Sequence, residues 1–548
     1  NDAYIQGIES LLDYEENEYK CENFRIIAKY IMRNTILENF LALFLGDAEY
    51  KIDDKFKLTY EETLANGKRR DIGIDLKKIF ITFKLEKIDA GDVALTRDKE
   101  VQNFYIHYVR KKNSQAKNLF YCNLTGKMDY CVTSHRGVIR RAKLISSNQP
   151  ETYYGRLKNR EDIYRISYEA SQKIHNMLKF LIDDRSYSTH IGKGAYIVNW
   201  LSKDLDRGGV DLLADMDSED FELDDFEESE EALVTDLGGR ISYNLGQYFL
   251  GADESFYSAN DFYILIIERV NDGRVAVKYF RRLSRSEAYK RAMNWYESTN
   301  WPVYEYKQKT VVEKSPSLNQ MVNFLYGYEN DRGFLSCEND ELRRSTIERL
   351  IPCIIDSQRL PRDILKTTFY KLCNKQSYKS CWETAINIGC SLIKKYKNDY
   401  EGYFIRAKEI GGVKQLQESR SFAYGRLMAI YEKLELDAVQ TRGSDGTSRS
   451  GDGRRITNAD RLWSSLIRTP ERTRFVLESK LRPYLNMLKR NNPGSYIYYD
   501  KLITEITLKL MELNTDITGS LSEDFILGYY YQKNDLYTKR STNMKKEG

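Results

Sequence analysis

The chain has 548 residues and a mass of 64.3 kDa, which is too long for one hydrophobic core and predicts several domains. Its 41% hydrophobic and 30% charged residues are typical of a globular protein and exclude a disordered or fibrous one, and its longest apolar runs are far shorter than the roughly 20 residues of a membrane span. The net charge is only +4, but it is distributed very unevenly.

The first half of the chain changes from a helical to a strand-like pattern. Apolar residues recur every three or four positions over 24–44, which predicts helices through the first 60 residues. Alternating apolar residues over 72–88 favour a strand (Ile79, Ile81, Phe83 and Leu85), and 119–148 indicate short strands around Gly126 and Gly137. A helix is expected at 161–183, with strands at 193–200 and 262–283; the latter form a hairpin across Asp272-Gly273, a pair that tolerates positive φ.

From residue 340 onward the pattern is helical almost throughout. The last segments, 420–439, 457–468, 471–490, 496–513 and 521–537, have the lengths and short connections of an antiparallel bundle. Thr457 and Thr469 stand where N-cap hydroxyls are expected, and Pro470 stands at a first helical position.

These patterns predict an α+β protein in which a mixed α/β N-terminal half with antiparallel strands precedes an all-helical C-terminal half ending in a four-helix-type bundle. We divide it into an α+β domain (1–335), a helical connecting region (336–419) and a C-terminal bundle (420–540). Residues 204–236, with 15 Asp or Glu and a single Arg, form an acidic insertion in the first domain.

Outside that insertion the chain is basic. Residues 341–548 hold 37 Lys or Arg against 25 Asp or Glu. A basic body favours a polyanionic partner such as nucleic acid, although an ordinary solvated surface is the alternative.

Motifs for catalysis are lacking in the sequence. The Gly-Lys pairs lack the leading glycine and following hydroxyl of a phosphate-binding P-loop, and no Gly-x-Ser-x-Gly elbow occurs. Cys122, Cys131 and His135 offer three zinc ligands without a fourth at a regular spacing, and the carboxylates of 204–236 come as a run rather than at strand ends. We therefore expect no catalytic residues, no metal and no cofactor, and the eight scattered cysteines predict reduced thiols in the cytoplasm.

Candidate binding residues are basic side chains in loops, whose charges suit phosphate contacts and counterion release. The 42 tyrosines add stacking faces for unpaired bases. The basic candidates form three groups: Lys68, Arg69 and Arg70; Arg136, Arg140, Arg141 and Lys143; and Arg454 and Arg455.

Several stretches occur in the order typical of one family: 121–126 (YCNLTG), 142–148 (AKLISSN), 167–179 (SYEASQKIHNMLK), 195–200 (AYIVNW), 274–301, 346–363, 421–430 (SFAYGRLMAI), 456–463 (ITNADRLW) and 525–539. With them the chain resembles the large subunit of the type I-C CRISPR surveillance complex (Cascade). The stretch 134–143 (SHRGVIRRAK) is shorter than the family's usual glycine- and serine-rich version.

The resemblance implies a non-catalytic subunit of a prokaryotic, cytoplasmic ribonucleoprotein. In such complexes CRISPR RNA reads the target by base pairing, while the large subunit inspects the duplex next to the target, the PAM, and supports opening of the DNA into an R-loop. The implied partners are the RNA-bound backbone subunits, the handle-binding subunit, small subunits, target duplex, displaced strand and a recruited helicase-nuclease, and no membrane. The 1–335 domain would then face the PAM and RNA handle.

Two alternatives stay open at this point: a nuclease-type effector and a purely structural scaffold of a ribonucleoprotein. The family resemblance also suggests that translation starting inside the gene, at Met428 or nearby, yields a free small subunit from the C-terminal bundle. A methionine in a helix core is the simpler interpretation of Met428.

Overall fold

The computed structural model describes residues 2–46, 48–63, 69–86, 93–116, 119–146, 156–157, 163–202, 261–305, 310–402, 419–440, 456–513 and 519–544. Contacts divide the chain into two compact units: unit 1 is Asn1–His135 with Ser147–Ile174, and unit 2 is Arg136–Ser146 with His175–Gly548. The acidic insertion 204–236 lies outside the described residues. The predicted division into three domains, 1–335, 336–419 and 420–540, stays a prediction. A unit defined by contacts is not necessarily a domain that folds independently.

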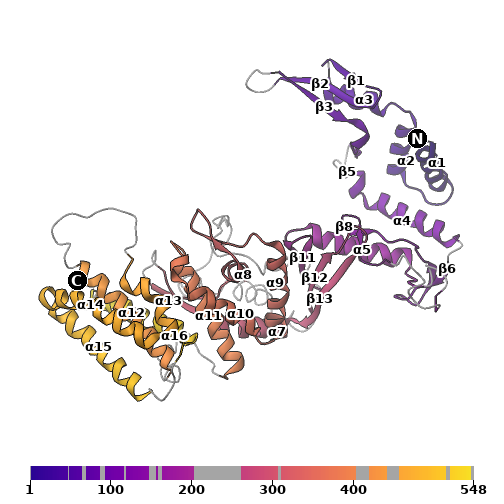
Figure 1. The fold of residues 1–548 in the computed structure, drawn as a ribbon. Coiled ribbons are helices and arrows are strands. Elements are labelled where there is room, and N and C mark those ends of the chain that lie inside the picture. Colours follow the sequence, from indigo (N-terminus) through magenta and orange to yellow (C-terminus); the bar gives the residue numbers. More distant parts are fainter. Residues whose placement is uncertain are drawn as a thin grey trace. The chain divides into compact units, whose positions relative to one another are not determined.

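Unit 1 begins with three helices, and a fourth, α4, follows its first strands (Figure 1). An aromatic side chain of α4 packs against the first two helices. Phe104 is 1% exposed and lies between Tyr14 and Phe24, with ring centroids 5.8 and 4.7 Å away. The helices and strands of unit 1 are α1 (Asp2–Asn17), α2 (Glu22–Met32), α3 (Ile36–Leu45), β1 (Tyr50–Ile52), β2 (Lys57–Thr63), β3 (Arg69–Asp75), η1 (Leu76–Lys78), β4 (Lys84–Leu85), β5 (Val93–Ala94), η2 (Leu95–Arg97), α4 (Lys99–Ser114), β6 (Leu119–Tyr121) and β7 (Met128–Tyr130).

Two sequence-based expectations for this unit are wrong in part. The helical start is confirmed only as far as Leu45, since β1 and β2 follow. The first part of the strand expected over 72–88 ends at Asp75, which pairs with Lys57, the first residue of β2. The Asp75 side chain then accepts a hydrogen bond from the Lys77 backbone and starts a 3-10 turn, and Phe80 is 96% exposed. Within the rest of the expected strand only Lys84 and Leu85 find a partner, in β5, so the pattern at 79–83 forms no ladder.

Unit 2 is built on a four-stranded antiparallel sheet in the order β10-β11-β12-β13. Its strands are β10 (Ser188–Gly192), β11 (Ala195–Leu201), β12 (Asp261–Arg269) and β13 (Val275–Ser284). The predicted hairpin is therefore confirmed, but its turn does not use the expected positive φ. Instead, the Gly273 backbone donates to Asn271 Oδ1 at 2.9 Å, so the asparagine side chain closes the turn.

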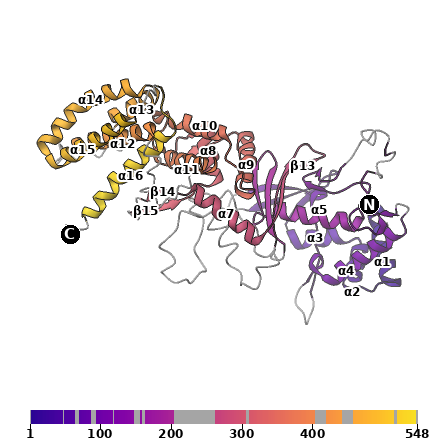
Figure 2. The ribbon, with the colours of Figure 1, turned by 90° about the horizontal axis from the view of Figure 1, so that it is seen from below.

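Helices cover both faces of this sheet (Figure 2). On one face Ile264 and Ile266 join a large core with residues of α7 (Arg285–Thr299) and α9 (Asp340–Ile355). On the other face Val198, Leu265 and Ile267 pack against α5 (Tyr168–Asp183) and the small hairpin of β8 (Gly137–Ile139) and β9 (Ala142–Lys143). The helix expected at 161–183 thus begins at Tyr168.

The large core continues through the remaining elements before the bundle. These are β14 (Trp301–Glu305), β15 (Thr310–Lys314), α8 (Leu318–Tyr326), β16 (Tyr328–Glu329), β17 (Leu335–Ser336), α10 (Arg362–Leu372), η7 (Lys375–Ser377) and α11 (Trp382–Tyr400). No helix among the described residues is long and apolar enough to span a membrane.

The C-terminal helices match the prediction within a few residues (Figure 1). Thr457 forms the expected capping box with Asp460, and Pro470 begins its helix, but the Thr469 hydroxyl donates back to Ser465 instead of capping. The α+β class is confirmed: antiparallel sheets occupy the N-terminal half and helices the C-terminal half. The bundle comprises α12 (Arg420–Gln440), α13 (Asn458–Arg468), α14 (Pro470–Asn491), α15 (Pro493–Glu512) and α16 (Asp524–Met544).

The central helix of the bundle, α12, is buried along most of its length. It crosses α16 at two glycines: a methyl group at Gly425 would lie 2.1 Å from the Phe525 carbonyl oxygen, and one at Gly528 would lie 2.1 Å from that of Phe422. Glycine is therefore required at both positions for the helices to approach this closely.

Candidate nucleic-acid interface

One basic group predicted from the sequence lies on the turn between β8 and β9. Val138, Ile139 and Ala142 are buried and fix this hairpin to the core beside the sheet. Arg140 adopts a left-handed conformation (φ 55°), and a Cβ at Gly137 would lie 2.6 Å from the Arg140 carbonyl oxygen. The tight turn thus needs its glycine and leaves two adjacent arginines, Arg140 and Arg141, in solvent.

The other two residues of this group have defined contacts. Arg136 is exposed and donates from Nη1 to Asn176 Oδ1 at 2.8 Å. Lys143 is half-buried; its backbone donates to the Gly273 carbonyl, and it forms a parallel bridge with Arg274. Sequence reasoning missed Arg274, because only the fold brings the β12–β13 turn beside β9. Arg140, Arg141 and Arg274 are exposed and form no ion pair within the described chain.

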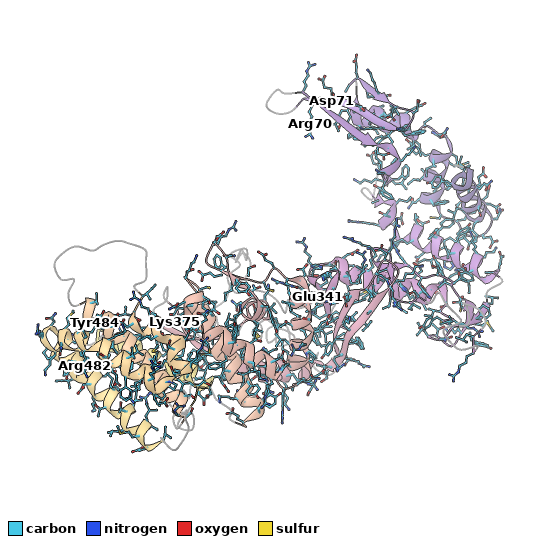
Figure 3. All side chains as sticks on the ribbon, in the orientation of Figure 1. Arg70, Asp71, Glu341, Lys375, Arg482 and Tyr484 are labelled. Atoms are coloured by element: carbon cyan, nitrogen blue, oxygen red, sulfur yellow. The ribbon has the colours of Figure 1, made fainter. Side chains whose placement is uncertain are left out.

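The basic candidates at the start of β3 belong to unit 1. Arg69 pairs with Glu61 at 3.3 Å on the neighbouring strand, and Arg70 is exposed (Figure 3). A joint contact surface of these residues with the 134–143 hairpin stays a prediction. Three further candidates, Lys68, Arg454 and Arg455, lie outside the described residues.

A stronger basic surface, not singled out residue by residue from the sequence, lies on α14. We define the α14 face as its five exposed cations, which form no ion pair within the part of the chain that the structure describes: Arg472, Lys480, Arg482, Lys489 and Arg490. Arg482 is labelled in Figure 3. The helix has only two acids, and both are engaged: Glu478 accepts from Arg474 at 2.7 Å, and Glu471 pairs with Arg420. The α14 face is therefore positive without local compensation.

Aromatic and apolar side chains accompany these charges. The Lys489 ammonium lies 5.6 Å from the centre of the Tyr496 ring, and Phe475 is 72% exposed. Such a mixture of cations and exposed rings is typical of surfaces that hold phosphates and stack on unpaired bases. An amphipathic pattern with six basic and two acidic residues in 470–491 was the available sequence signal.

The three potential zinc ligands have other partners. Hydrogen bonds from Thr125 and the Ser167 backbone outweigh burial and lower the pKa of Cys122 to about 6, whereas burial raises the pKa of Cys131. His135 Nδ1 lies 2.9 Å from Ser171 Oγ. Within the described ranges, no group of three or more His, Cys, Asp or Glu residues is arranged to hold a metal ion.

Residues 1–537 match the family model of the CRISPR-associated protein Cas_Csd1. No curated protein matches the chain. The matched region covers unit 1, unit 2 as far as residue 537, and the collinear stretches on which the resemblance to a Cascade large subunit rests, except the last two residues of 525–539. The chain therefore belongs to the Csd1 family of CRISPR-associated proteins, the family of the type I-C large subunit.

Proposed function

We propose that this protein is the non-catalytic large subunit of a type I-C RNA-guided surveillance complex in the prokaryotic cytoplasm. It inspects the PAM duplex, supports R-loop formation and recruits a helicase-nuclease, while CRISPR RNA bound to the backbone subunits reads the target sequence. Family membership supports a place in such a complex.

The α14 face is the observation that carries the binding role. Five uncompensated cations on one helix attract a polyanion, and each phosphate neutralised releases counterions. We assign this face to the displaced single strand, because the exposed Phe475 ring and the half-buried Tyr496 ring beside the cations suit unpaired bases better than a closed duplex. The arginines of the β8–β9 turn are assigned to duplex DNA near the PAM or to the RNA handle.

Mobility shifts of the assembled complex on PAM-bearing and PAM-lacking duplexes, with Mg²⁺ present and cleavage monitored, test the proposal. We expect tighter binding to the PAM-bearing duplex and no cleavage without the helicase-nuclease. Equal binding of both duplexes would favour the structural scaffold. Metal-dependent cutting that is lost on substitution of one carboxylate would instead favour the nuclease-type effector.

A triple variant tests the α14 face directly: Arg472→Gln, Arg482→Gln and Lys489→Gln. Each lost phosphate contact on a single strand reduces the slope of log K against log salt by about 0.7. The matched control neutralises three exposed cations elsewhere in unit 2: Lys290, Arg332 and Lys366. Equal binding of R-loop substrates by both variants would contradict the assignment.

A further inference from the structure

Three aromatic side chains form a row across the central sheet of unit 2. Trp200 on β11 pairs with Tyr263 on β12, and their rings are nearly parallel, with centroids 5.2 Å apart and planes at 6°. Phe280 on β13 pairs with Leu265, which lies two residues after Tyr263 on β12. The ring centroids of Phe280 and Tyr263 are 6.2 Å apart. Since alternate residues of a strand share a face, all three lie on the face that carries Val198 and Leu265.

The row lies where the helical cover of this face ends. Val198 and Leu265 are buried under α5 and the β8–β9 hairpin, but Trp200 and Tyr263 are only half-buried and Phe280 is 47% exposed. β13 is also an edge strand of the sheet. The aromatic row is therefore open to a ligand along one border of the sheet.

The cations near the row are paired, whereas those at the far end of β13 are not paired within the described residues. From residue 274 to 284, β13 and the residue before it contain four cations and no acid, but Lys278 pairs with Glu268 and Arg281 with Asp356. Arg282 lies opposite Tyr263 on the same face; it donates to Asp261 at 2.8 Å and its side chain is still 64% exposed. At the other end of β13, Arg274 adjoins β9, which follows Arg140 and Arg141.

We propose that the row of Trp200, Tyr263 and Phe280 stacks on bases of unpaired nucleic acid. Arg282, beside Tyr263, and the arginines at the far end of β13, Arg140, Arg141 and Arg274, hold the phosphates. The eight residue steps from Arg274 to Arg282 span about 26 Å at about 3.3 Å per residue, which accommodates several nucleotides. Exposed rings alone would suit a protein partner equally well. Arg140, Arg141 and Arg274, which form no ion pair within the described chain, favour a polyanion.

This inference rests on the proposed function only in requiring that the protein meets an unpaired strand, and it adds a second site for one, distinct from the α14 face. Both DNA and RNA present the required bases and phosphates. Parallel measurements with short oligo-dT and oligo-rU distinguish these two sources.

Binding of labelled oligo-dT and oligo-rU to the full chain, followed by fluorescence anisotropy, tests the proposal. Phe280→Leu keeps an apolar side chain but removes the ring, and Phe280→Tyr restores a stacking face on the same edge strand. Stacking energies predict that Phe280→Leu raises the Kd by about 5- to 100-fold, whereas Phe280→Tyr binds like the wild type. Tyr370→Leu, at a 79% exposed ring on α10, is the control and leaves the Kd unchanged.

Tryptophan fluorescence provides an independent readout. Of the five tryptophans, Trp295, Trp301, Trp382 and Trp463 are at most 5% exposed, so quenching by a bound strand reports on Trp200. Trp200→Phe keeps a stacking ring and should bind while losing the quenched signal.

Three results would overturn the inference: unchanged binding by Phe280→Leu, failure of Phe280→Tyr to restore binding, or saturation by oligonucleotide without quenching of Trp200. If loss of the Phe280 ring instead weakens association with another subunit of the complex, the row is a protein interface. The proposed function is tested separately, by mobility shifts on PAM-bearing and PAM-lacking duplexes and by the triple variant of the α14 face. Failure of this inference therefore does not contradict the proposed function.

Discussion

Lys375 and Glu432 form a buried ion pair that ties the turn after α10 to the central helix of the bundle. The Lys375 Nζ lies 3.1 Å from Glu432 Oε2, with side chains 7% and 8% exposed (Figure 3). The ammonium also lies within 5.5 Å of the ring centres of three aromatic residues: Trp382, Trp463 and Tyr529. The bundle is thus joined to the preceding helices by a charge as well as by apolar packing.

Replacing this lysine should destabilise the protein strongly. Lys375→Met leaves the Glu432 carboxylate buried without the ammonium, which costs about 3–5 kcal/mol of unfolding free energy. The control is Lys193→Met, whose partner Glu341 is 63% exposed and whose loss should cost about 0–1 kcal/mol. Urea denaturation of both variants measures the difference, and similar losses would contradict the prediction.

Lys394 predicts a pH dependence of stability. Its buried Nζ donates to the carbonyl oxygens of Glu297 and Asn300, at 2.8 and 2.9 Å, at the end of α7. Burial lowers its pKa from 10.5 to about 8, an effect that the charges of Glu313 and Glu297 partly oppose. The folded state therefore binds fewer protons than the unfolded state between these pH values, and stability should rise with pH there, by at most about 1.4 kcal/mol per unit.

Lys394→Met serves as the reference, because every other titrating group is present in both proteins and its contribution cancels. The unfolding free energy of the wild type minus that of Lys394→Met should increase from pH 8 to pH 10. A difference that is constant or decreases over this range would show that the ammonium is buried at no cost.

Neutralising the turn arginines should weaken nucleic-acid binding without unfolding the protein. Arg140→Gln with Arg141→Gln removes two exposed charges, and two lost phosphate contacts reduce the slope of log K against log salt by about 1.8 on duplex DNA. Equal losses on all sequences would indicate phosphate contacts, and an altered sequence preference would indicate base reading. The control is Arg332→Gln, at another exposed arginine. An unchanged salt slope in the double variant would show that the turn arginines contact solvent and not nucleic acid.

If translation starts at Met428, the resulting C-terminal fragment should be less stable than the whole bundle. Met428 is completely buried in α12, and a chain beginning there lacks the first two turns of that helix, with Phe422 and Gly425 at the crossing with α16. We expect a fragment of residues 428–548 to unfold at lower temperature than one of residues 420–548, which calorimetry of the two purified fragments measures.

Intact-mass analysis of the complex expressed from the native gene tests whether such a fragment exists. Met428→Leu is the matched variant, because a similar volume in the core costs less than about 1.5 kcal/mol. Absence of any C-terminal product, with no change in Met428→Leu, would contradict internal initiation.

The sequence by itself determined the local elements and the family. Helix limits in the bundle follow from residues adjacent in the chain, such as the capping box of Thr457 and the proline that begins α14. The β12–β13 hairpin likewise follows from two strand patterns separated by a short turn. The collinear stretches identified the family without any knowledge of contacts.

Only the tertiary structure decided which patterns find partners. The alternation over 79–85 resembles a strand, but only Lys84 and Leu85 meet a partner strand, at Val93–Ala94. The lysines at 394 and 397 are buried because carbonyl and carboxylate groups from distant segments surround them. Arg274 beside the β8–β9 turn, and the row of Trp200, Tyr263 and Phe280, are brought together across large separations in sequence. Such contacts depend on strand pairing and packing between distant elements, which local propensity does not encode.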